Sequence, residues 1–95
     1  MLYLLVSTPH PSRPDEARDA RTAFRAWIDD LKAKRKVVHF YYRVGRGIAA
    51  VLDVDSNDEL HAIMTQWTNI VPVTFDVYPL VSPSGAEAVL KQPNG

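Results

Sequence analysis

The stretch VVHFYYRVGRGIAAVLDV, residues 37–54, decides the fold of this chain. It contains two runs rich in β-branched and aromatic residues, VVHFYYRV and IAAVLDV, joined by the short segment GRG. Two such runs with glycines between them predict a β-hairpin, because glycine readily adopts the backbone angles that tight hairpin turns need. We therefore expect a pair of antiparallel strands at the centre of the chain.

A helix is predicted on each side of this hairpin. Residues 12–36 repeat apolar side chains every three or four positions, with Ser12 as the expected N-terminal cap and Pro14 in the first turn. The apolar stripe of this helix consists of Ala17, Ala20, Phe24, Ile28 and Leu31, with Trp27 at its border. In residues 55–67, Ser56 and Glu59 have the spacing of a capping box. The stripe that follows consists of Leu60, Ile63, Met64 and Trp67.

The outermost elements are two further strands. Residues 2–7, LYLLVS, and residues 73–81, VTFDVYPLV, are apolar runs of strand length, and three prolines end the first run within residues 8–14. The order βαββαβ with right-handed crossovers predicts a ferredoxin-like α+β sandwich, a four-stranded antiparallel sheet with both helices on one face. We expect this domain to span residues 1–82 and a tail to span residues 83–95, which packs on a neighbour or frays.

Composition narrows the class of protein. Eleven basic residues balance eleven acidic ones, so neither nucleic acid nor a membrane is an expected partner. The chain has no cysteine, its three histidines match no metal-ligand spacing, and no glycine-rich phosphate loop is present, so we expect no metal and no cofactor. No segment has the length of a membrane span or the pattern of a signal peptide, which favours a cytoplasmic protein.

The side of the sheet that the helices leave open carries the candidate site. Alternation along each strand predicts which residues lie on this open face. They are Tyr3, Leu5 and Ser7, then Val37, His39, Tyr41 and Arg43, then Ala49, Val51 and Asp53, and finally Thr74, Asp76 and Tyr78. On the second strand Val38, Phe40, Tyr42 and Val44 are expected to face the helices.

An open face of this composition is too apolar to remain exposed to water. Self-association of two sheets would cover it and would enclose a cavity whose polar groups are His39, Arg43, Asp76 and the tyrosines. The alternative is a solvated sheet edge at which His39 and Arg43 prevent unwanted strand pairing, with Asp76 paired to Arg43. Both interpretations fit the pattern.

Several segments resemble the muconolactone isomerase family. These are MLYLL at residues 1–5, YYRVGR at 41–46, LDVDSNDELH at 52–61 and VTFDVYPL at 73–80, and residues 53–61 are the most specific of them. The resemblance covers roughly residues 1–80. It implies a ferredoxin-like protomer in a dimeric α+β barrel-type assembly or a larger ring, and cofactor-free isomerisation of an unsaturated lactone carboxylate during aromatic degradation.

Such an isomerase needs a proton carrier, a donor to the dienolate oxygen and a cation for the carboxylate. The expected catalytic residues are His39, Tyr41 and Asp76. The expected substrate-binding residues are Tyr3, Arg43, His61 and Tyr78, with Arg43 on the carboxylate and His61 at the position of the family's Leu-His pair. The family also carries an acidic residue within its first helix, where this chain has Phe24 and Arg25.

That departure keeps two other classes of function open. One is a non-catalytic homo-oligomeric module that binds a small molecule or a protein. The other is a cofactor-free oxygenase or cyclase, which rests on fold analogy.

Overall fold

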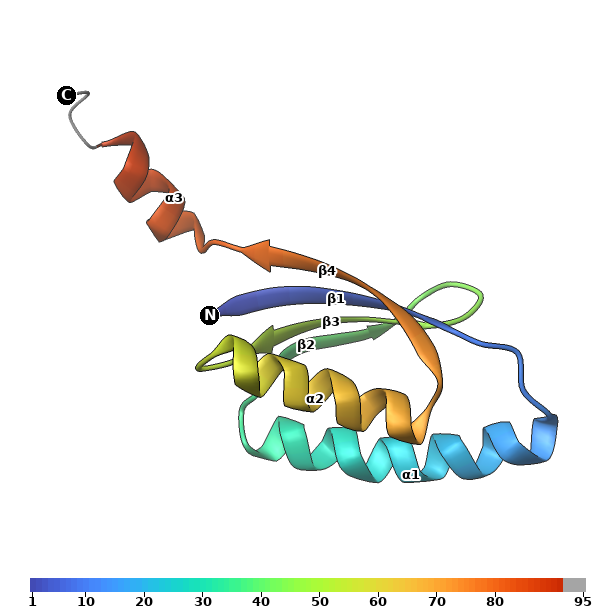
Figure 1. The fold of residues 1–95 in the computed structure, drawn as a ribbon. Helices are drawn as coiled ribbons and strands as arrows, with labels where there is room; N and C mark the ends of the chain where they lie inside the picture. Colours follow the sequence, from blue (N-terminus) through green and yellow to red (C-terminus); the bar gives the residue numbers. More distant parts are fainter. Residues whose placement is uncertain (92–95) are drawn as a thin grey trace.

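The computed structural model describes residues 1–91 and contains the predicted elements plus one C-terminal helix (Figure 1). The strands are β1 (Leu2–Pro9), β2 (Val37–Tyr42), β3 (Ile48–Asp53) and β4 (Val73–Leu80). The helices are α1 (Pro14–Ala33), α2 (Asn57–Ile70) and α3 (Pro83–Leu90). All strand pairs are antiparallel and the sheet order is β2-β3-β1-β4, so the ferredoxin-like α+β architecture is confirmed.

The core lies between the sheet and the helices α1 and α2, which cover the same face (Figure 1). Its buried side chains are Leu5, Phe24, Ile28, Leu31, Ala50, Leu52, Val54, Leu60, Ile63 and Trp67. Trp67 is at its centre, 5.1 Å from the Phe24 ring and edge-on to Phe75 at 5.0 Å between centroids. Trp27 is half-buried at the border, where its Nε1 donates to Gln66 Oε1 at 2.9 Å, as its place beside the stripe predicted.

The two helices begin in different ways. Arg13, not Ser12, is the N-cap of α1, and it makes no side-chain capping bond, so the prediction for Ser12 is wrong. Pro14 is the physical reason: it starts the helix, and a residue before proline is held in the extended conformation that Arg13 has. In α2 the cap is confirmed, because Ser56 Oγ accepts from Glu59 N at 3.1 Å.

The predicted faces are wrong at three places. Tyr3, Leu5 and Ser7 point toward the helices, because they pair with Leu52, Ala50 and Ile48, which share that side. In LYLLV both the odd-numbered and the even-numbered positions are apolar, so alternation does not indicate which of them face the helices. The pairing with β3 determines this.

The second error lies at the start of β2. A register shift between Val37 and His39 turns Val37 toward the core and leaves Val38 exposed. Val44, also expected to face the helices, is exposed in the turn after β2.

Of the predicted tail, Pro83–Leu90 form a helix that stands apart from the sandwich, and residues 92–95 lie outside the described part of the chain. Ser82 Oγ accepts from Gly85 N at 3.1 Å and caps α3, which projects beyond the end of β4 (Figure 1). No side chain of Pro83–Leu90 is buried, and the described chain measures 59 × 26 × 19 Å, so α3 adds length rather than core. Over residues 1–91, none of the helices combines the length and the apolar character that crossing a membrane requires.

Candidate functional site

The open face has an apolar centre with polar groups at its two edges. Leu4 lies between Val51 of β3 and Tyr78 of β4, and Val6 lies between Ala49 and Asp76. Leu4, Val6, Ala49 and Val51 are only half-buried, and Tyr41 and Tyr78 are exposed. Within one protomer, this apolar strip has no covering layer in the described residues.

The predicted catalytic residues do not meet within one protomer. The rings of His39 and Tyr41 lie side by side on β2, with centroids 6.3 Å apart and planes within 14°. Asp76 and Tyr78 are on β4, at the opposite edge of the sheet. Because β3 and β1 lie between them, the two pairs are roughly 14 Å apart at three strand spacings. A site made from all four needs a second molecule.

Arg43 has a different environment from the one expected. Its Nη1 donates to the Ser7 carbonyl oxygen at 3.1 Å and to Thr8 Oγ1 at 3.0 Å. It therefore holds the end of β1, and among the described ion pairs none joins it to Asp76.

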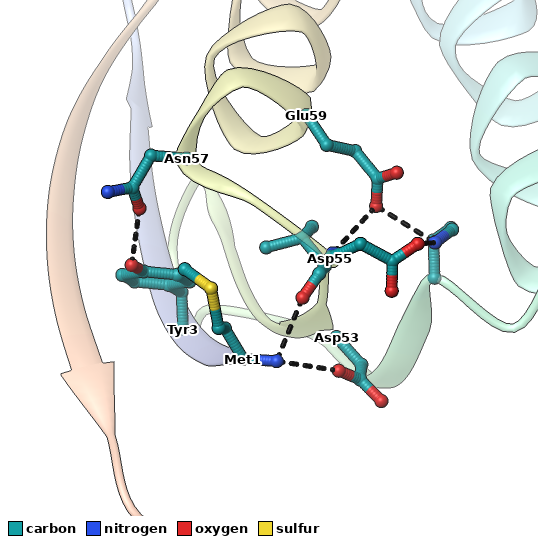
Figure 2. Close-up of polar contacts among 8 residues, drawn as sticks. Met1, Tyr3, Asp53, Asp55, Asn57 and Glu59 are labelled. Atoms are coloured by element: carbon teal, nitrogen blue, oxygen red, sulfur yellow. Dashed lines mark hydrogen bonds and ion pairs between the residues drawn. The ribbon is translucent and has the colours of Figure 1, made fainter.

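Tyr3 and His61 are not part of the open face. The Tyr3 hydroxyl donates to Asn57 Oδ1 at 2.6 Å and joins β1 to the first turn of α2 (Figure 2). His61 lies exposed on α2, and its backbone oxygen accepts from Thr65 Oγ1 at 2.8 Å. The prediction that Tyr3 faces the open side is wrong.

A cluster of charged side chains at the start of α2 stabilises the fold. Glu59 points back toward Asp55, whose backbone N donates to Glu59 Oε1 at 3.3 Å, so the reciprocal bond expected at Ser56 N is made one residue earlier (Figure 2). Lys36 Nζ lies 2.9 Å from Glu59 Oε1 and 3.2 Å from Asp55 Oδ2. Hydrogen bonds to Glu59 and then Asp55 raise the pKa of Lys36 above its usual 10.5.

A cavity of about 790 Å³ lies at the other end of the molecule, between the first half of α1, the β2–β3 turn and the end of α2. Its apolar walls include Phe24, Ile48, Trp67 and Val73. The space exists because Ala17 and Ala20 occupy the inward stripe of α1 here, whereas Phe24, Ile28 and Leu31 fill the corresponding space further along. None of the seven predicted site residues lines it.

The mouth of this cavity is mainly positive. Arg21 and Arg25 come from α1 and Arg46 from the β2–β3 turn, and Glu16 is the one acidic side chain among the lining residues. These four side chains are exposed. An excess of guanidinium groups favours a ligand that carries negative charge.

His10 lies at the edge of the cavity, directly after β1. Its backbone N donates to Pro72 O at 3.0 Å, and its Nε2 lies 2.9 Å from Thr74 Oγ1. The described structure gives Nδ1 no hydrogen-bond partner, so this nitrogen remains available to a ligand.

Sequence reasoning missed the cavity residues. The sequence places Ala17 and Ala20 in the apolar stripe, and their small size beside Phe24 is the signal that space remains there. His10 and Arg46 lie in loops, where no periodicity indicates which way a side chain points. Within residues 1–91, histidine, aspartate and glutamate side chains do not gather in threes that could hold a metal ion.

A second depression, of about 460 Å³, lies on the solvent side of α1 among Arg18, Arg21, Arg25 and Asp29. All of its lining residues are exposed and belong to one helix, so it has no buried wall. The larger cavity is therefore the better candidate site.

Together, the fold and the cavity define a small ferredoxin-like α+β protein with room for a ligand between its sheet and its helices. The chain belongs to the family described as "Domain of unknown function (DUF3303)", whose model matches residues 1–94. The comparison with curated proteins finds no match to this chain.

Among solved structures, the chain is similar to TftG, the 5-chloro-2-hydroxyhydroquinone dehydrochlorinase of Burkholderia phenoliruptrix AC1100, in complex with 2,5-dihydroxybenzoquinone. The TM-score is 0.67 at 19% sequence identity, over 88% of this chain and 97% of that one. At this identity the similarity establishes the shared fold.

Proposed function

We propose that this protein is a cofactor-independent enzyme that moves a proton on a small, cyclic, unsaturated carboxylate or lactone. The observation that carries the proposal is the cavity, which combines aromatic walls, a cationic mouth and a histidine at its edge. Aromatic walls suit a planar ring, and arginine suits a carboxylate or another oxyanion. We place this enzyme in the cytoplasm, as the sequence predicts.

His10 is the proposed proton carrier. An imidazole is the side chain that exchanges a proton most readily near neutral pH. The backbone bond to Pro72 holds His10 at the edge of the cavity, and Thr74 binds Nε2 of its ring. Within residues 1–91, Nδ1 has no hydrogen-bond partner. In this arrangement Arg25 and Arg46 bind the negative group of the substrate, and His10 removes and returns the proton.

Two resemblances support a ring-shaped substrate. Segments of the sequence resemble the muconolactone isomerase family, and we propose distant kinship with it. TftG shares the fold, and the ligand in its complex, 2,5-dihydroxybenzoquinone, is also a small unsaturated ring.

The open face is proposed to bind a second copy of the chain. Its strip of half-buried apolar residues flanked by Tyr41 and Tyr78 would be covered when two sheets meet. We also propose residues 1–82 as the domain and residues 83–95 as a tail. Helix α3 of this tail packs on the partner, because none of its side chains is buried within its own protomer.

A second candidate site lies at that interface. The parallel arrangement of His39 and Tyr41 favours it, because both rings present polar atoms on one side of β2. In a dimer, Asp76 and Tyr78 of one molecule would complete this site with His39 and Tyr41 of the other. Arg43 is the expected carboxylate anchor there.

Calorimetric titration tests the proposal. The protein is titrated with muconolactone, cis,cis-muconate and benzoate, and we expect micromolar to millimolar binding of at least one. Arg25→Ala should weaken that binding about tenfold, as expected for loss of a charged hydrogen bond. Arg18→Ala is the matched control, since it removes the same charge from α1 outside the cavity.

Binding without any proton exchange would favour the non-catalytic module. Equal binding by wild type and Arg25→Ala would show that Arg25 of α1 does not bind the ligand. Binding of none of the three compounds would contradict the proposed substrate class.

A further inference from the structure

The cavity beside α1 is larger than a single ring requires. Its volume is about 790 Å³. An apolar cavity of roughly 150 Å³ is enough to hold one benzene ring, and pockets for larger organic ligands measure roughly 300–1,000 Å³. The space in this protein therefore fits a ligand of more than one ring.

The accessible walls of the cavity are small and apolar. Ala17, Ala20, Ile48 and Ile70 line it, and each of these side chains is only half-buried. Tyr42 also lines it, with 68% of its surface exposed, so an aromatic ring is open to a ligand there. Such walls suit a flat, uncharged ring system, because its burial there leaves no polar group without a partner.

The charge changes sign along the α1 wall. Glu16 and Arg25 both line the cavity, and nine residues of helix put them about 13.5 Å apart along the axis of α1. Arg25 attracts an anionic group, whereas Glu16 repels one. A ligand with a single charged end therefore binds with that end at Arg25 and with its body pointing toward Glu16.

Two alanines lie along the path of such a body. By the rise of the helix, Ala20 is about 7.5 Å and Ala17 about 12 Å from Arg25 along the axis of α1. Their small side chains leave space at two successive positions beside the helix. A single ring held by its carboxylate at Arg25 fills the first part of this space and leaves the part beside Ala17 empty.

We propose that the ligand of this cavity is an aromatic acid of two or three fused rings. Its carboxylate binds Arg25 and Arg46, and its rings extend along Ala20 toward Ala17. This inference rests on the proposed function, since it takes the same cavity as the site, and it specifies the size and shape of the ligand.

A series of acids that differ only in the number of rings tests the proposal. Benzoate, 2-naphthoate and anthracene-2-carboxylate each carry one carboxylate on one, two and three fused rings. In calorimetric titrations of the wild type, the affinity should rise about fivefold with each added ring, because each ring buries more apolar surface. Arg25→Ala should weaken all three by a similar factor, because they share the carboxylate.

Two substitutions locate the rings. Ala20→Leu fills the space nearer Arg25 and should abolish the gain from the second and the third ring. Ala17→Leu should abolish only the gain from the third ring. Benzoate should change by less than about twofold in both variants. Ala23→Leu, on the exposed side of α1, is the matched control and should bind all three acids as the wild type does. Circular dichroism should show that the three variants are folded.

Each other outcome overturns the proposal. Fused-ring acids that bind no tighter than benzoate would show that the site holds one ring, and the proposed function would stand. Tighter binding that neither Ala20→Leu nor Ala17→Leu reduces would place the rings away from α1. Equal weakening of benzoate and the larger acids would show that the two alanines only maintain the shape of the cavity. If the wild type binds none of the three acids, nor muconolactone or muconate, the proposed function fails as well.

Discussion

Lys36 and Glu59 connect the end of the α1–β2 segment to the first turn of α2, with Nζ and Oε1 2.9 Å apart. The same Glu59 oxygen accepts from Asp55 N, and Lys36 also reaches Asp55 Oδ2. One carboxylate therefore completes a helix start and binds a cation from the neighbouring segment.

This contact predicts a pH dependence. The pKa of Lys36 is raised by Glu59 and Asp55, so the charged lysine stabilises the folded state, fully so below its usual value of 10.5. The contribution is lost as the pH rises through the higher folded-state pKa. Urea unfolding from about pH 9 to pH 12 should therefore show a steeper loss of stability for wild type than for Lys36→Met. Parallel curves would show that the contact does not contribute in solution.

The two helix starts predict that alanine substitution lowers stability at one serine and hardly changes it at the other. Ser56→Ala removes the acceptor for Glu59 N and should lower the free energy of unfolding by about 1 kcal/mol. Ser12→Ala should change it by less than about 0.5 kcal/mol, because Ser12 caps nothing in the structure. Chemical denaturation of both variants measures the difference. Equal losses would contradict the assignment of Arg13 as the N-cap.

The architecture could be predicted from the sequence because each element carries its own signal. The hairpin glycines, the stripe from Ala17 to Leu31 and the Ser56–Glu59 pair all indicated the correct elements. β1 is the exception in orientation: its apolar run has no alternation, so only pairing with β3 places Tyr3 and Leu5 on the core side.

The candidate cavity could not be predicted in the same way. It depends on how far the β2–β3 turn reaches toward α1, and on where the loop after β1 carries His10. Those positions follow from tertiary packing, which periodicity does not encode. Alternation predicts the correct face for His39, Tyr41, Asp76 and Tyr78. The order of the strands, however, separates the first two from the last two.

The turn next to Ser7 gives a test of packing. Gly45 and Gly47 have φ angles of +96° and +100°, so alanine is strained at both, by about 1–2 kcal/mol. Gly45→Ala meets no other atom, whereas Gly47→Ala collides with the Ser7 carbonyl. Gly47→Ala should therefore destabilise the protein distinctly more than Gly45→Ala in thermal denaturation. Similar losses would mean that the two strands separate easily at this point.

Self-association predicts a specific effect at the centre of the open face. Val51 lies between His39 and Leu4 on neighbouring strands, and a lysine there would place a charge in the proposed interface. Light scattering at micromolar concentration should give at least a dimer for wild type and a folded monomer for Val51→Lys. Ala26→Lys, on the exposed side of α1, is the control and should keep the wild-type mass. A monomeric wild type would contradict the interface.

The two histidines distinguish the cavity from the open face as the place of proton transfer. We expect His10→Gln to lower the rate of hydrogen–deuterium exchange into muconolactone about a hundredfold, since a positioned acid–base group contributes at least that much. Glutamine retains a polar contact with Thr74, so KM should change little. His39→Gln should exchange at the wild-type rate, because His39 lies across the sheet from the cavity. Nuclear magnetic resonance in D₂O measures the exchange rate of both variants.

A slow His39→Gln variant beside a His10→Gln variant with the wild-type rate would place proton transfer at the open face, where His39 and Tyr41 lie together. The exchange activity should then disappear in the monomeric Val51→Lys variant. Exchange that neither substitution reduces would mean that neither histidine carries the proton.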